Sequence, residues 1–240
     1  MLLPLYLAMN PAEMSASPLP AHLGWMACHF SSFGSGIANV PKELPKGAML
    51  ILNDRIPCQG HSPDLVAAQL ADAAVRLGCE SLLLDFQRQD SPETDAVVDA
   101  ILSAASCPVG VSEWYAPGRS CPVLLSPPPL HSTLQAHLNP WKDREIWLEA
   151  SLTQDCVTVT RDGAKFFPQF PVENLEGGFY DDTLCCHYHT CVAPEQITFT
   201  LFDTPESLAK KLDEAAVLGV KRAVGLYQEL GAFLTGKESA

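Results

Sequence analysis

Short apolar segments recur along the chain between polar and proline-rich connections. The clearest is the run from Leu82 to Leu84, which is continuous and short enough for a strand buried on both faces. Similar segments predict eight buried strands in all, over residues 2–8, 23–30, 48–53, 81–86, 108–113, 122–126, 145–151 and 222–227. Eight is the number of strands that a (β/α)8 barrel requires.

Apolar residues at helical spacing predict helices between some of these strands. The helix over 63–77 has Ser62 as its N-cap candidate, and Gly78 closes it. Further patterns predict helices over 92–105 and 205–218 and a short one near 132–138. Prolines and glycines leave little room for a helix after the first and second strands. The chain is therefore predicted to be an α/β protein, a TIM-like (β/α)8 barrel reduced by the loss of some outer helices.

Two alternating segments follow the seventh predicted strand and do not belong to the barrel pattern. Residues 156–160 and 164–170 flank an Asp162-Gly163 turn, which predicts a β-hairpin. Residues 187–201 alternate again and lead to the helix that begins at Pro205. We therefore expect a single barrel domain over 1–240, with a hairpin insertion over 152–201 within it.

Composition excludes several classes of function. The net charge is −13, from 28 acidic and 15 basic residues, so most of the surface repels nucleic acid. The chain has no run of 18 apolar residues, so no membrane span is predicted. Its apolar N-terminus lacks a basic segment and contains Pro4, which favours a first strand over a secretory signal. Nine scattered cysteines favour reduced thiols inside a cell.

A cluster of potential metal ligands, Cys185, His187, His189 and Cys191, lies on one face of a predicted strand. Thiolate and imidazole ligands would suit zinc. Successive residues on one face of a strand are about 7 Å apart. Neighbouring pairs could chelate, but four ligands from one extended segment cannot close a tetrahedron. Buried thiols with ordinary histidines are therefore favoured over a zinc site, and we expect no metal and no other cofactor.

Polar residues end two of the predicted strands, where barrel proteins carry their chemistry. Asp85 and Gln87 follow the apolar run of the fourth strand. Glu113 ends the fifth strand and is followed by Trp114 and Tyr115, whose flat rings suit stacking on a pyranose. These residues form the predicted site.

The later part of the chain resembles glycoside hydrolase family 18, the chitinase-like barrels. The residues that carry the resemblance are an aspartate, a Ser-Leu-x-x-Lys helix, a glycine and the last strand with its flank, here Asp203, 207–211, Gly219 and 225–231. The helix before the fourth strand and the hairpin after the seventh match as well, from about Lys46 onward. The greatest similarity is to compact bacterial members linked to spore coats and peptidoglycan. It implies a carbohydrate partner, such as peptidoglycan or a chitin-like oligosaccharide, and a cytoplasmic or spore-associated location.

The chain departs from the family pattern at its reactive positions. The family's fourth-strand signature is Asp-x-x-Asp-x-Asp-x-Glu, and only the third aspartate is present, as Asp85. Leu83 replaces the middle aspartate, and Gln87 replaces the proton-donating glutamate. Gln228 stands where the family has the tryptophan under the sugar. The resemblance implies that Asp85 can still hold an N-acetylated sugar, whereas an amide cannot protonate the leaving group.

Three functions remain open. The first is an N-acetylhexosamine-binding barrel with weak or lost hydrolysis, in which further substrate contacts come from Asp54, Trp114, Tyr115, Tyr227 and Gln228. The second is an active glycosidase with a substitute acid, for which Glu113 is the first candidate and Asp54 and Glu229 are others. An unrelated small-molecule enzyme on the same barrel is the third alternative, because fold does not determine function.

Overall fold

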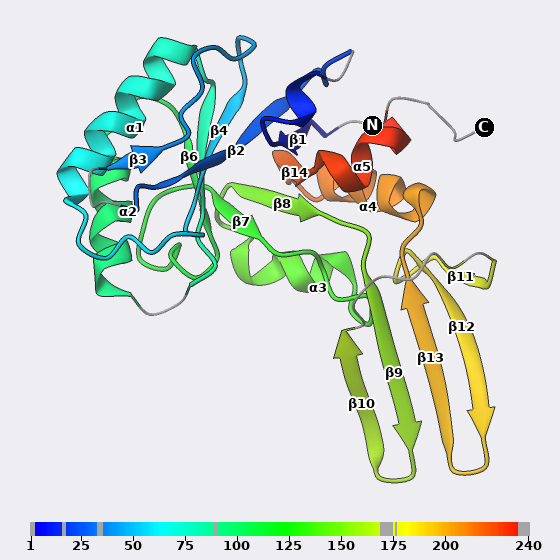
Figure 1. The fold of residues 1–240 in the computed structure, drawn as a ribbon. Coiled ribbons are helices and arrows are strands. Elements are labelled where there is room, and N and C mark those ends of the chain that lie inside the picture. Colours follow the sequence, from blue (N-terminus) through cyan, green and yellow to red (C-terminus); the bar gives the residue numbers. More distant parts are fainter. Residues whose placement is uncertain are drawn as a thin grey trace.

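A closed ring of eight parallel strands forms the body of the molecule, and an antiparallel sheet projects from it (Figure 1). The structure is a computed structural model that describes residues 3–15, 18–32, 36–88, 91–168, 175 and 177–234. The ring consists of β1 (Leu5–Met9), β2 (Leu23–Phe30), β4 (Met49–Asn53), β5 (Ser81–Asp85), β6 (Val109–Ser112), β7 (Val123–Leu125), β8 (Ile146–Ala150) and β14 (Arg222–Leu226). Strand β1 pairs with both β2 and β14 and so closes the barrel. The eight-stranded barrel prediction is confirmed, and β3 (Ile37–Ala38) adds an antiparallel strand outside the ring.

The helices are few and unevenly placed. They are α1 (Pro63–Leu77), α2 (Pro92–Ala104), α3 (Leu134–Leu138), α4 (Pro205–Val217) and α5 (Tyr227–Leu234), with 3-10 turns at Glu13–Ser15 and Asn139–Trp141. Helix α1 begins as predicted, because the Ser62 side chain accepts a hydrogen bond from the Leu65 N–H, and it ends at Gly78 with φ +65°. The described residues of the connections after β1, β2 and β6 contain no α-helix, as expected for a reduced barrel. None of the described helices has the length and apolar character needed to cross a membrane.

The interior of the barrel is packed with side chains, among them Tyr6, Met49, Leu83 and Trp147. Trp147 is fully buried against Gly110, where a Cβ atom would lie 2.4 Å from its ring. The amino-terminal end of the barrel is closed by Arg222, whose guanidinium lies 4.9 Å from the Trp147 ring centre. Within the ring of strands, these side chains fill the centre and the amino-terminal end.

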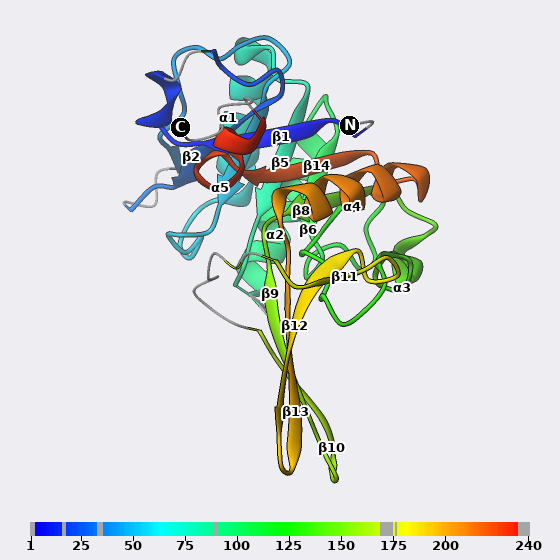
Figure 2. The same cartoon turned by 90° about the vertical axis from the view of Figure 1, so that its right-hand side faces the viewer.

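An insertion follows the seventh barrel strand, β8, as predicted, and it contains more strands than a single hairpin. It is a five-stranded antiparallel sheet in the order β10-β9-β13-β12-β11, built from β9 (Gln154–Thr160), β10 (Gly163–Pro168), β11 (Phe179–Asp181), β12 (Cys186–Ala193) and β13 (Gln196–Phe202). The predicted turn at Asp162-Gly163 joins β9 and β10, while residues 169–170 of the predicted hairpin lie outside the described residues. Residues 187–201 form a second hairpin rather than one strand. Both hairpins extend away from the barrel as a narrow arm (Figures 1 and 2).

A buried ion pair anchors this arm to the barrel. The Lys211 ammonium donates to Asp203 Oδ1 at 2.6 Å, and the Ser207 hydroxyl donates to the same oxygen at 2.9 Å. The Thr153 hydroxyl donates to Asp203 Oδ2 at 3.0 Å. Because Thr153 precedes β9 and Asp203 follows β13, the network ties both ends of the arm to α4. The aspartate, serine and lysine that carry the family resemblance are thus structural residues in this fold.

Candidate functional site

A cavity of about 80 Å³ opens among the carboxyl ends of the barrel strands. Its floor is apolar and is formed by Ala8, Met26, Ile51, Leu83, Leu124, Val224, Gly225 and Leu226. Its polar residues are Asp85, Gln87 and Glu149, and the described residues that line it include no lysine or arginine. The cavity therefore combines an apolar floor with carboxyl and amide groups that lack a basic counter-ion.

Asp85 and Gln87 are two residues apart at the end of β5, and both reach the cavity. The Gln87 amide nitrogen donates to Asp85 Oδ1 at 2.6 Å. Burial raises the pKa of Asp85, the hydrogen bond from Gln87 lowers it, and the charge of Asp54 raises it further. The fold therefore brings Asp85 and Gln87 together at the carboxyl ends of the strands. The hydrogen bond from the Gln87 amide favours the ionised form of Asp85, which accepts hydrogen bonds.

Glu149 is the cavity residue that sequence reasoning did not single out. Alternation along β8 places Trp147 and Glu149 on the inner side of the barrel, with Trp147 in the core and Glu149 at the cavity. Burial raises the pKa of Glu149 from 4.5 to about 7, and the charges of Asp85, Glu229 and Glu113 raise it too. The sequence does contain one indication of this site residue, namely a glutamate at an inward-facing position of a predicted buried strand.

Glu113 and its aromatic neighbours lie beyond the cavity. The Ser126 hydroxyl donates to Glu113 Oε1 at 2.8 Å, and Glu113 does not line the cavity. The Trp114 side chain is about half exposed, at 49%. Tyr115 is buried, and its hydroxyl donates to the Arg88 backbone oxygen. Of the three, Trp114 is the residue with a ring face open to a ligand.

Asp54 forms hydrogen bonds with the loop after β5. It is buried, and its Oδ2 atom accepts from the backbone N–H groups of Gln87 at 3.1 Å and Arg88 at 2.7 Å. These two contacts fix the backbone on which Gln87 is mounted. Asp54 is thus a positioning residue for the site.

Asp54→Ala is expected to lower the free energy of unfolding by about 1–3 kcal/mol, because two backbone donors lose their charged acceptor. Urea denaturation followed by circular dichroism measures the change. Asp72→Ala, on the exposed side of α1, is the control and should change stability by less than about 0.5 kcal/mol. Equal effects of the two substitutions would contradict the role of Asp54.

The last barrel strand ends one residue earlier than predicted. Strand β14 stops at Leu226, and Tyr227 is the first residue of α5. Leu226 lines the cavity, whereas Tyr227 and Gln228 do not, and Gln228 is exposed. Glu229 is held by the Ser151 hydroxyl at 3.0 Å. Because α5 begins at Tyr227, Gln228 lies on the helix and not on the floor of the cavity.

The cysteine and histidine cluster does not form one row on a strand. Cys185 precedes β12 and has φ +53°. His187 and His189 both stack on Phe202, with ring centres 5.6 and 5.2 Å away. Cys191 is exposed near the far end of the strand. The described residues contain no group of three side chains placed to hold a metal ion.

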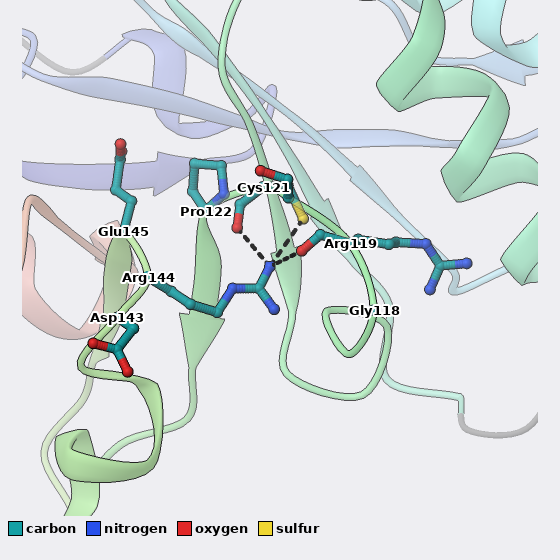
Figure 3. Close-up of a pocket in the computed structure, with 8 residues that line it drawn as sticks. Gly118, Arg119, Cys121, Pro122, Asp143, Arg144 and Glu145 are labelled. Atoms are coloured by element: carbon teal, nitrogen blue, oxygen red, sulfur yellow. Dashed lines mark hydrogen bonds between the residues drawn. The ribbon is translucent and has the colours of Figure 1, made fainter.

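A larger depression of about 600 Å³ lies at the amino-terminal ends of β7 and β8 (Figure 3). Arg144 donates to the backbone oxygens of Arg119 and Cys121, as Figure 3 shows. Arg119 forms ion pairs with Asp95 at 2.7 Å and Asp99 at 2.6 Å. Both guanidinium groups therefore serve the packing of this end of the barrel, the end associated with stability rather than chemistry in such folds.

Comparison with known proteins finds similarity at the level of structure. No protein-family model and no curated protein matches the chain. A GH18 chitinase of Cycas revoluta, a double mutant in complex with (GlcNAc)4, superposes with a TM-score of 0.58 at 10% identity, covering 96% of this chain and 97% of that one. A chitinase of Chromobacterium violaceum gives 0.55 at 12% identity, with 97% of each chain covered.

The spore cortex-lytic enzyme SleL of Bacillus cereus is also similar in structure. Its TM-score is 0.52 at 12% identity, covering 93% of this chain and 70% of that one. Identities this low show the fold alone. The chain therefore has the barrel fold of chitinases and spore cortex-lytic enzymes, as the family resemblance implied.

Proposed function

We propose that the barrel mouth binds an N-acetylhexosamine-containing glycan, chitin-like or derived from peptidoglycan, and has lost most or all of the hydrolysis that chitinase-like barrels perform. The observation that carries this proposal is the Gln87 amide, which lies in the cavity and donates to Asp85. The shared fold supports the ligand class, since the Cycas revoluta chitinase holds (GlcNAc)4. The name of the similar cortex-lytic enzyme SleL supports the spore-associated alternative for location as part of the same proposal.

The chemistry of the two residues explains binding without turnover. In family 18 the acetamido group of the substrate attacks the anomeric carbon, and a carboxylic acid protonates the leaving oxygen. Asp85 can accept a hydrogen bond from the acetamido N–H. Gln87 has no proton to transfer near neutral pH, and the loss of a general acid costs about 10²–10⁴ in rate.

Titration of the protein with the GlcNAc tetramer, followed by calorimetry, tests the proposal. The wild-type protein is expected to bind, and Asp85→Ala is expected to weaken binding by about tenfold or more, because a hydrogen bond to a charged group is lost. Asp72→Ala, remote from the cavity, should bind like the wild type. If the tetramer does not bind, or if Asp85→Ala binds equally well, the proposed function is wrong.

A further inference from the structure

Glu149 has an unusual environment for a carboxyl group. It lines the cavity beside Ile51, Leu83 and Val224, and none of the described side chains or backbone groups forms a hydrogen bond with its carboxyl group. Glu149 is partly buried. An ionised carboxylate without a partner is strongly disfavoured in an apolar setting. The carboxyl group is therefore expected to stay protonated unless a bound ligand provides a hydrogen-bond partner.

Lys211 and Asp203 line a second, smaller pocket with Glu149, and there the Lys211 ammonium is paired with Asp203 at 2.6 Å. The charges that raise the pKa of Glu149 are all acidic. Asp85 approaches from β5, Glu113 from the loop after β6 and Glu229 from α5. Each of these three has its own donor: the Gln87 amide for Asp85, and the hydroxyls of Ser126 and Ser151 for the two glutamates. Hydrogen bonds to a carboxylate favour its charged form. No described group donates a hydrogen bond to the Glu149 carboxyl, so Glu149 is the member of the group that holds the proton.

We propose that Glu149 binds the glycan as a neutral carboxylic acid, donating a hydrogen bond to the carbonyl oxygen of an acetamido group, and that the glycan is released when Glu149 ionises. This inference rests on the proposed function and deepens it. A carboxylic acid held neutral so that it can donate a hydrogen bond is a known device of buried sites.

The cavity is complementary to an acetamido group at three points. The Asp85 carboxylate accepts from its N–H, the Glu149 carboxyl donates to its carbonyl oxygen, and the apolar floor with Ile51 and Leu83 receives its methyl group. A free amine offers neither the acceptor oxygen nor the methyl group. The site thereby distinguishes an N-acetylated sugar from its deacetylated counterpart.

The direction of the pH dependence follows from the ionisation of Glu149. Below about pH 7 the carboxyl is neutral and donates, whereas above that pH it is a carboxylate that repels the carbonyl oxygen. Since only the neutral form binds, affinity for the GlcNAc tetramer is expected to fall about tenfold for each pH unit above 7.

Calorimetric titration with the GlcNAc tetramer at pH 6, 7, 8 and 9 tests the inference. Glu149→Gln retains a donor that does not ionise, so it is expected to bind within about threefold of the wild type at pH 6 and to show no loss at pH 9. Glu149→Leu has no donor and should bind at least about tenfold more weakly at pH 6. Glu43→Gln is the matched control, because Glu43 is exposed and distant from Glu149 in the sequence, and this variant should keep the wild-type pH profile.

Three results would overturn the inference while leaving the proposed function intact. They are a wild-type affinity that is flat from pH 6 to 9, a Glu149→Leu variant that binds like the wild type, and tighter binding of the free-amine GlcN tetramer than of the GlcNAc tetramer. The last result would mean that Asp85 and Glu149 act as an anionic pair. Absence of GlcNAc binding at every pH would instead remove the proposed function on which the inference rests.

Discussion

Gln87→Glu is expected to raise hydrolysis of a chromogenic GlcNAc oligomer by about 10²–10⁴-fold over the wild-type protein. The reason lies in the 2.6 Å contact between the Gln87 amide nitrogen and Asp85 Oδ1. A glutamate in that position would face a carboxylate at the same distance, and two carboxyl groups this close hold one proton between them. The substitution therefore places a proton donor at the position that the family resemblance implies for the acid.

Release of 4-nitrophenol from the oligomer measures this gain. Gln135→Glu, on the exposed side of α3, introduces the same change in charge away from the cavity and should leave the rate unchanged. If Gln87→Glu binds the oligomer and shows no gain, the remaining site is not competent for hydrolysis. If the wild type already turns over rapidly and Glu113→Gln abolishes that activity, Glu113 is a substitute acid and the loss of hydrolysis is refuted.

Lys211→Met is expected to lower the free energy of unfolding by about 3–5 kcal/mol, because it leaves the Asp203 carboxylate buried without its counter-ion. The side chains of Lys211 and Asp203 are 6% and 2% exposed, so solvent does little to screen the remaining charge. The network they form joins α4 to both ends of the projecting sheet. The arm should consequently become easier to cleave by protease.

Urea denaturation and limited proteolysis measure these two effects. Lys210→Met, at the neighbouring position of α4, removes an exposed ammonium 4.1 Å from the Tyr180 ring centre and should cost no more than about 1 kcal/mol. The double variant Asp203→Leu with Lys211→Met should be less destabilised than Lys211→Met alone, since no lone charge stays buried. A Lys211→Met variant as stable as Lys210→Met would contradict the anchoring role of the ion pair.

Much of the barrel could be predicted because its elements are defined locally. Continuous apolar runs such as Leu82–Leu84 indicate strands buried on both faces, and the cap residues Ser62 and Gly78 mark the two ends of α1. The two-residue spacing of Asp85 and Gln87 likewise follows from the chain alone. The pairing among the five strands of the insertion was harder to predict, because it joins segments that are distant in the sequence.

The barrel strands, the main helices and the amide that the family resemblance aligns with an acid could all be predicted from the order of residues along the chain. The folded barrel was needed to show which carboxyl groups lie close together. Asp54, predicted as a substrate contact, accepts hydrogen bonds from the backbone after β5, whereas Glu149, unremarkable in its strand, shares the cavity with Asp85. The physical reason is that periodicity is a local property of the chain. The burial of Glu149 and the acidic charges around it arise only when barrel closure brings β5, β8 and α5 together.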